Sequence, residues 1–225
     1  MGIKFSLLSV IALMAAVFVG VKVAGLHYFF GVVVPYAAVA TFLGGFIYRI
    51  LLWARTPVPF NITTTTGQQQ SLPWIKQNKL DNPSTVAGTI GRMALEVLLF
   101  RSLFRNTKYE YQEGPKLTYQ WEKWLWLFGL LFHYSFLVIF IRHLRFFAEP
   151  IPGFIHATEG LDGMLQIGLP GVYLTDAIFI VAVTFLFLRR VVVPQMRYIS
   201  LPADYFPLFL LFSLGLTGII MRYFA

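Results

Sequence analysis

Long apolar runs alternate with polar segments along the whole chain. Five of these runs are long enough to cross a bilayer as helices, and they lie near residues 5–24, 27–52, 124–147, 169–188 and 204–224. A membrane-spanning helix needs about 20 consecutive, mostly apolar residues. The pattern therefore predicts an all-α integral membrane bundle of about five transmembrane helices, forming a single domain over residues 1–225.

The first apolar run has two interpretations. A secretory signal would end at a small-residue cleavage site that is followed by polar residues. Here the run reads on through Lys22 into the second run without such a polar stretch. We therefore expect a membrane span near residues 5–24 rather than a cleaved signal.

The charged residues between the runs predict which side of the membrane each segment occupies. Lysine and arginine gather in segments 54–120 and 189–203, whereas segment 148–168 has acidic residues and no lysine or arginine. Positively charged segments remain on the cytoplasmic side. We expect a multi-pass protein of a prokaryotic cytoplasmic (inner) membrane, with its N-terminus inside and residue 225 outside.

The predicted cytoplasmic segment, residues 54–120, has two parts. Residues 56–70 (TPVPFNITTTTGQQQ) are rich in Thr, Gln and Pro, and we expect an ordered or partner-covered loop there. In residues 81–106, apolar positions recur at spacings of three and four and are flanked by arginines, which predicts an amphipathic helix. Such a helix suits either the membrane interface or the docking of a partner protein.

Composition supports the membrane assignment and limits the chemistry. The chain is 57% hydrophobic and only 12% charged, which is too apolar for an ordinary soluble domain. It has no cysteine, so it offers no thiolate ligands for zinc or for an iron–sulfur cluster. The net charge of +8 lies in segments that set topology and meet anionic lipid. We therefore expect the lipid bilayer as a partner and no nucleic acid.

Two of the four histidines, His133 and His143, lie in one apolar stretch, FHYSFLVIFIRHLRFF at 132–147. A polar ring inside a bilayer is costly, so it indicates a functional site. Ten residues of helix rise about 15 Å and place the two rings about 80° apart. A single metal ion would need ligands three or four residues apart. The spacing therefore favours two haem groups at two depths, each with its iron bound by one imidazole.

A plainer reading of the same stretch also exists. His133 would then only form a hydrogen bond between helices, and His143 would lie in the membrane interface. Arg142 and Arg145 break the positive-inside pattern at the outer end of this run. Haem propionates near that surface would compensate them, but contacts with lipid headgroups would also suffice.

Three further residues are candidates for a quinone or haem site on the outer side. Asp176 lies near the outer start of the fourth run, where a helix N-terminus favours an acidic residue. It could instead accept a proton from a bound quinol. His27 begins the second run and His156 lies in the outer segment, and each could be a surface residue, a haem ligand or a quinol partner.

Five segments of the sequence carry a resemblance to a known family. They are VVVPYAAVATFLGGFIYRI (32–50), GQQQSLPWIKQNKLDNPSTVAGTIGRMALEVLLFRSLFRNT (67–107), FHYSFLVIFIRHLRFFAEPIPGF (132–154), LPGVYLTDA (169–177) and LGLTGIIMRYFA (214–225). The chain resembles the diheme cytochromes b of the nitrate reductase gamma-subunit-like family. Within that family it is similar to the membrane subunit M (DsrM-type) of the sulfite-reduction-associated DsrMKJOP electron-transfer complex.

The resemblance implies one or two haem b groups with His133 and His143 as ligands, because one helix of the family carries two histidines ten residues apart. The family takes the opposite axial ligands from two histidines on a later helix, and the last two apolar runs here have none. Either the sequence is the first part of a longer protein, or His27 and His143 share the outer haem.

The resemblance also implies a function, in which the chain exchanges electrons between menaquinol, or another quinone, and a cytoplasmic iron–sulfur subunit resembling heterodisulfide reductase. That subunit would dock on the segment 54–107. Other implied partners are a periplasmic multihaem cytochrome c, a ferredoxin-like iron–sulfur protein and a second quinone-interacting membrane subunit. The alternatives are a cofactor-free membrane anchor and a small proton-relaying transporter, the latter disfavoured because the chain has no repeated half.

Overall fold

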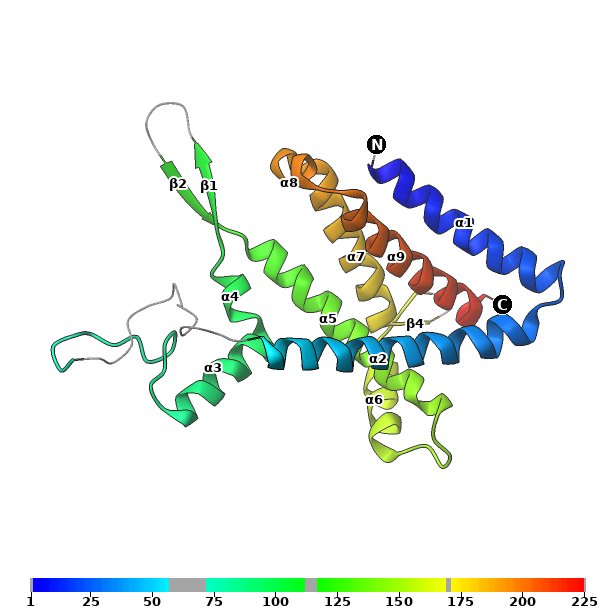
Figure 1. Cartoon of the computed structure of the whole chain (residues 1–225), viewed down its shortest axis with the longest axis horizontal. Coiled ribbons are helices and arrows are strands. Elements are labelled where there is room, and N and C mark those ends of the chain that lie inside the picture. The colour runs from blue at the N-terminus through cyan, green and yellow to red at the C-terminus, as the bar shows by residue number, and fades with distance from the viewer. Residues whose placement is uncertain (1, 57–71, 112–116, 169–170, 225) are drawn as a thin grey trace. The chain divides into compact units, whose positions relative to one another are not determined.

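The computed structural model of the protein describes residues 2–56, 72–111, 117–168 and 171–224 (Figure 1). Packing divides the chain into two units, one made of residues 1–7 and 86–225 and the other of residues 8–85. The loop predicted at 56–70 lies outside the described residues from position 57 onward.

The smaller unit contains two long apolar helices, and the first of them begins in the larger unit. Helix α1 runs over Gly2–Lys22, and a π-helical turn, η1 (Phe29–Val33), leads directly into α2 (Val34–Arg55). Pro35 lies in the first turn of α2, where its missing N–H is tolerated. A Cβ at Gly20 would overlap the present position of the Phe30 ring, so the glycine lets this ring pack against α1 where the connection folds back.

The larger unit has a bundle of three helices at its centre, α5 (Lys123–His143), α7 (Leu174–Val192) and α9 (Pro202–Tyr223). A 3-10 turn, η2 (Leu144–Phe146), extends α5. Helix α7 packs against both neighbours. Phe128 of α5 stacks on Phe185 of α7 with ring centroids 3.9 Å apart. A Cβ at Gly215 of α9 would lie 2.6 Å from the Phe179 ring, so the absence of a side chain there lets α9 approach α7.

Ion pairs tie the helices together at both ends of this bundle. At one end, Arg189 of α7 pairs with Glu122 before α5 at 2.7 Å. Ser6 donates a hydrogen bond to the carbonyl of Pro202 at the same end, at 2.8 Å. A short helix, α8 (Pro194–Ile199), turns the chain from α7 into α9 there. The predicted cytoplasmic segment 189–203 therefore lies at the same end of the bundle as the start of α5, as the charge pattern requires.

Four helical segments among the described residues are long and apolar enough to cross a membrane: Gly2–Lys22, Phe29–Arg55, Lys123–Phe146 and Pro202–Tyr223. They match four of the five predicted spans to within a few residues. The fifth, predicted at 169–188, forms the helix α7, but it is displaced toward the C-terminus and contains Asp176, Arg189 and Arg190. The bundle accepts these charges because each has a polar partner on another part of the unit.

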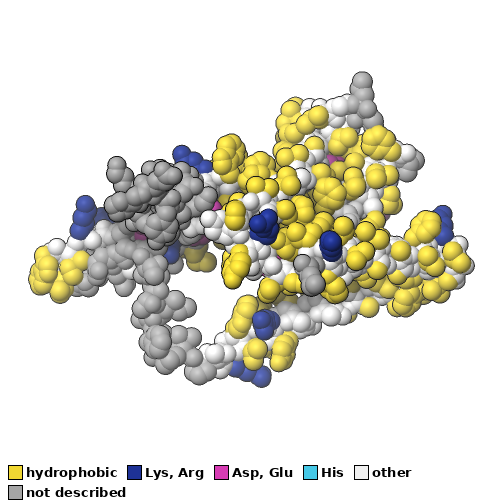
Figure 2. Space-filling model, turned by 90° about the horizontal axis from the view of Figure 1, so that it is seen from above, with side chains coloured by type: hydrophobic (Ala, Val, Ile, Leu, Met, Phe, Trp, Pro, Cys, Tyr) yellow, Lys and Arg dark blue, Asp and Glu magenta, His cyan; other side chains and the backbone are white. Residues whose placement is uncertain are grey.

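The surface of the described residues agrees with a lipid environment. Large hydrophobic side chains on the spanning helices are extensively exposed, for example Phe18 at 64% and Phe42 at 67%. Figure 2 shows hydrophobic side chains over most of the described surface in that view, with Lys and Arg at scattered positions. The structure confirms the predicted all-α membrane bundle.

The connecting segments contain short elements that the sequence did not predict. Strands β1 (Thr107–Tyr111) and β2 (Leu117–Trp121) form an antiparallel hairpin just before α5. Helix α6 (Gly153–Gly163) and the two-residue strands β3 (Gln166–Ile167) and β4 (Val172–Tyr173) connect α5 to α7. Residues 169 and 170, where the fourth span was predicted to begin, lie outside the described residues.

The predicted amphipathic helix at 81–106 is interrupted near its end. Helix α3 covers Val86–Leu99 and α4 covers Arg101–Phe104. Between them, Phe100 has a left-handed backbone with φ 49°, which is uncommon for a residue other than glycine. The Phe100 ring packs edge-on against His133, with centroids 4.9 Å apart. The packing of this ring against His133 accompanies the break in the helix. The helical periodicity of the sequence does not reveal this break.

Glu96 stabilises the break between α3 and α4. Its carboxylate accepts hydrogen bonds from the backbone N–H of Ser102 at 2.9 Å and from the Ser102 hydroxyl at 2.7 Å. Burial raises the pKa of Glu96, but the two bonds from Ser102 and the nearby Arg92 and Arg101 lower it more. The pKa therefore lies below the ordinary value of 4.5.

This pKa direction predicts a pH dependence of the α3–α4 junction. A carboxyl group with a lowered pKa in the folded state stabilises that state above its ordinary pKa, and the contribution is lost as pH falls below 4.5. We expect Glu96→Gln to reduce the hydrogen-exchange protection of residues 100–104 at pH 7, with a cost of about 1 kcal/mol. The protection of the unsubstituted protein should approach that of the variant at acidic pH. Equal protection factors for both proteins at pH 7 would contradict this role, and Ser102→Ala provides the matched partner variant.

Candidate functional site

His133 and His143 adopt the same local arrangement on α5. The Nδ1 atom of His133 lies 2.7 Å from the carbonyl oxygen of Gly129, and Nδ1 of His143 lies 2.7 Å from the carbonyl oxygen of Ile139. A carbonyl oxygen only accepts hydrogen bonds, so Nδ1 carries the proton in both rings. The lone pair of each neutral imidazole is therefore on Nε2. This is the tautomer that binds iron through Nε2 while a second group fixes the ring orientation.

Both imidazoles are exposed, and an apolar stripe of α5 connects them. The residues between them on this side of the helix are Phe136, Leu137 and Phe140, which are between 45% and 54% exposed. A porphyrin needs an apolar surface beside its axial ligand, and facing helices of a bundle commonly provide it. The donors and the surface therefore fit haem b, and His133 and His143 would each hold one haem iron. The sequences of α7 and α9 contain no histidine, so the opposite ligands do not come from these two helices.

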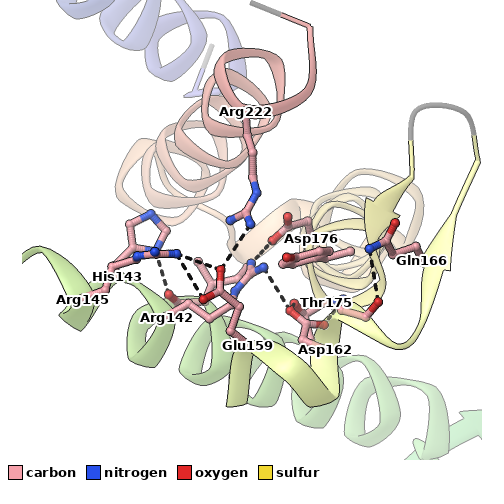
Figure 3. A network of polar contacts seen from close by, with 12 residues as sticks. Arg142, His143, Arg145, Glu159, Asp162, Gln166, Thr175, Asp176 and Arg222 are labelled. Carbon is pink, nitrogen blue, oxygen red and sulfur yellow. Dashed lines mark hydrogen bonds and ion pairs between the residues drawn. The ribbon is translucent and has the colours of Figure 1, made fainter. Parts of the chain in front are cut away.

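The C-terminal end of α5 carries a buried charge network, drawn in Figure 3. Arg142 is only 3% exposed. Its Nη2 donates a short hydrogen bond to Asp176 of α7, and its Nη1 lies 3.1 Å from Asp162 of α6. The guanidinium also lies 4.7 Å from the centroid of the Tyr173 ring. Helices α5, α6 and α7 are therefore joined at this end through one arginine.

Asp176 has a second partner at the end of α9. The Tyr223 hydroxyl donates a hydrogen bond to its other carboxylate oxygen at 2.9 Å and accepts one from the Tyr173 backbone N–H at 3.1 Å. Both oxygens of the predicted proton acceptor are thus engaged by side chains from other elements. Asp176 is 7% exposed, which separates it from the surrounding solvent.

Sequence reasoning missed several members of this network. Asp162 accepts two hydrogen bonds from Thr175, and Glu159 pairs with Arg145 at 2.8 Å and with Arg222 at 3.6 Å. From the sequence, Asp162 and Glu159 are recognised only as part of the acidic charge of segment 148–168. The arginines near the C-terminal ends of α5 and α9 were the available signal, because a buried arginine requires an acidic partner from another segment.

The arginine network revises the environment expected for the two arginines. Both guanidinium groups have carboxylate partners within the chain, Arg142 between two aspartates and Arg145 with Glu159. The Arg145 side chain is 38% exposed, whereas that of Arg142 is 4% exposed. Arg145 is the more accessible of the two to an anionic group outside the protein.

The remaining two candidates lie apart from this network. His156 is exposed on α6, one residue after the buried Ile155. His27 is exposed at the start of the second apolar helix and belongs to the other unit of the chain. Their roles as haem ligands or quinol partners stay predictions.

Two known proteins are similar to most of this chain. The chain is 44% identical over 199 residues to the Hdr-like menaquinol oxidoreductase cytochrome b-like subunit of Archaeoglobus fulgidus, which is 87% of this chain and 59% of that relative. It is 44% identical over 193 residues to the protein of the same name from Archaeoglobus profundus, covering 84% of this chain and 57% of the relative. The chain thus spans less than two thirds of the length of these relatives.

No family model and no solved structure matches the chain. The apolar helices and the two relatives nevertheless agree on the class of protein. The chain is a multi-pass membrane protein similar over most of its length to cytochrome b-like subunits.

Proposed function

We propose that the chain is the haem b-bearing membrane subunit of a complex that transfers electrons between a quinone and an iron–sulfur protein. The observation that carries this proposal is the matched pair His133 and His143, each with Nδ1–H held by a backbone carbonyl and Nε2 free on an apolar stripe. Relatives named as subunits of a menaquinol oxidoreductase support the same class of function.

The two histidines of α5 would bind two haem groups at different positions along this helix. His133 and His143 would each hold one haem iron through Nε2, with the carbonyls of Gly129 and Ile139 fixing the rings. Haem b bound there would supply reversible one-electron transfer. The rise of about 15 Å between the rings places the two sites at different depths of the membrane. His27 is a further candidate for a haem ligand in this proposal.

Menaquinol is the proposed quinone, and the outer end of the bundle is the proposed place where its protons leave. Asp176 is the proposed proton acceptor, and it accepts hydrogen bonds from Arg142 and Tyr223. His156 of α6 is a second candidate to interact with the quinol. Arg145, half-exposed beside Glu159, is suited to hold a haem propionate. Arg142 would orient Asp176 rather than meet a propionate itself, because it is buried between carboxylates.

The finer assignment follows the family resemblance. We propose a DsrM-type subunit, related to the gamma subunit of nitrate reductase, in a complex of dissimilatory sulfur metabolism. Its N-terminus would be in the cytoplasm, where a heterodisulfide-reductase-like iron–sulfur subunit docks on residues 54–107. A periplasmic multihaem cytochrome c, a ferredoxin-like protein and a second quinone-interacting membrane subunit would complete the complex.

The test is the haem content of the purified full-length protein and its reaction with a quinol. We expect a b-type reduced-minus-oxidised spectrum, two haems per polypeptide by pyridine haemochrome analysis, and reduction by a menaquinol analogue in nanodiscs. One haem would instead support a shared ligand pair of His27 and His143. A colourless protein that still assembles with its partners would overturn the proposal in favour of the cofactor-free anchor.

A further inference from the structure

Helix α3 carries an apolar stripe that is exposed in the part of the chain that the structure describes. Val86, Ile90, Met93 and Val97 recur at spacings of three and four, so they share one face of the helix. They are 78%, 63%, 60% and 67% exposed. The opposite face, with Gly88 and Leu95, is less exposed, so the stripe points away from the rest of its unit.

The C-terminal end of α3 is fixed to the membrane-spanning helix α5 at two points. Trp126 Nε1 donates a hydrogen bond to the Leu99 carbonyl at 2.6 Å, and the Tyr134 hydroxyl donates one to the Leu98 carbonyl at 2.9 Å. These carbonyls lie in the last turn of α3, where no intrahelical N–H can reach them. Two side chains of α5 thus provide hydrogen-bond donors for the last two carbonyl groups of α3.

The positions of Trp126 and Tyr134 give the depth of this attachment. They follow Lys123, where α5 begins, by three and eleven residues. A helix rises about 1.5 Å per residue, so the Cα atoms of Trp126 and Tyr134 lie roughly 5 and 16 Å along α5, and the adjacent carbonyls of Leu98 and Leu99 lie between these two levels. The hydrocarbon core is about 30 Å thick, so the end of α3 lies within the leaflet that contains the Lys123 end of α5. An unsatisfied carbonyl at this depth is costly, which explains why both are hydrogen-bonded.

We infer that α3 is embedded in this leaflet of the bilayer and that its apolar stripe contacts lipid acyl chains. The segment 86–105 has three arginines, Arg92, Arg101 and Arg105, against one acidic residue, Glu96. This net positive charge suits the anionic headgroups of the same leaflet. Of the two alternatives that the sequence left open for this helix, the inference selects the membrane interface. The proposed iron–sulfur subunit would then dock on parts of residues 54–107 other than the stripe of α3.

The embedding also has a consequence for the His133 site. Phe100 follows α3 directly, and its ring contacts the imidazole of His133. The lipid-held helix therefore positions the aromatic ring that covers one side of this imidazole. The inference about lipid stands on the contacts of α3 and α5 and does not require that haem is bound.

The absence of native cysteine makes the test direct. Single variants Ile90→Cys and Val97→Cys in the full-length protein would be labelled with an environment-sensitive fluorophore and reconstituted alone in phosphatidylcholine and phosphatidylglycerol vesicles. Leu13→Cys in α1 is the lipid reference and Lys79→Cys the aqueous reference. Arg92→Cys, about 130° from the stripe on the same helix, is the matched control.

We expect doxyl-labelled lipids to quench the fluorescence of the two stripe labels as strongly as that of the Leu13→Cys label. Aqueous iodide should leave the fluorescence of the stripe labels unchanged, as it should for the Leu13→Cys label. The Arg92→Cys label should be quenched less by the lipids. Quenching of the stripe labels by iodide to the extent of Lys79→Cys would overturn the inference and favour a surface for a soluble partner. Protection from both quenchers would also overturn it, because protein would then cover the stripe. A far-ultraviolet circular dichroism spectrum and a thermal unfolding midpoint equal to those of the unlabelled protein show that each variant is folded.

Discussion

Replacing His133 by alanine is expected to abolish one b-type component of the reduced-minus-oxidised spectrum, and replacing His143 the other. Each variant should lose about half of the haem of the full-length protein. The reason is that Nε2 of each ring is proposed to bind a separate iron, and alanine removes that ligand. Quinol-dependent reduction of the remaining component should stop with the variant that removes the haem nearer the quinone. Full haem content in both variants would contradict the assignment.

Two controls separate loss of a ligand from loss of folding. Ser213→Ala removes a hydroxyl of α9 that donates to the carbonyl of Phe209 in the same helix, and it should leave the haem content unchanged. His133→Gly, supplied with free imidazole, should recover part of the lost component, since the small molecule can occupy the vacated position. If His27→Ala and His143→Ala remove the same component, these two residues share one haem.

The second large effect is expected at Arg142. Arg142→Met would leave Asp162 and Asp176 buried without their cation, and removing one partner of a buried ion pair typically costs about 3–5 kcal/mol. The loss would be measured as the free energy of unfolding in mixed micelles titrated with dodecyl sulfate. The effect is a consequence of burial, because the same charges at an exposed site would be stabilised by water.

Arg145 provides the matched control for this prediction. It pairs with Glu159 at the same end of α5, but its side chain is 38% exposed, so Arg145→Met should cost no more than about 1 kcal/mol. The double variant Arg142→Met/Asp176→Leu should be more stable than Arg142→Met alone, because one uncompensated carboxylate is removed. Equal stability of the two single arginine variants would show that the Arg142 ion pairs do not hold the bundle together.

The sequence by itself determined the membrane class, the helices and the two central histidines. Runs of about 20 apolar residues have few stable alternatives in a bilayer, since only a helix satisfies all backbone groups within one segment. The positions 133 and 143 were visible because polar rings are rare in such runs. The local arrangement of both rings depends only on carbonyls four residues earlier in the same helix, so it too follows from helix formation.

Only the tertiary structure decided which distant residues meet. Asp162, Glu159 and Tyr223 lie on different elements from Arg142, and no sequence period links them to it. The break of the amphipathic helix at Phe100 likewise depends on contact with His133 and on bonds between Glu96 and Ser102. Apolar periodicity identifies a helix and its apolar face, but the partner of a buried charge and the depth of α3 beside α5 are set by packing between helices that are far apart in the chain.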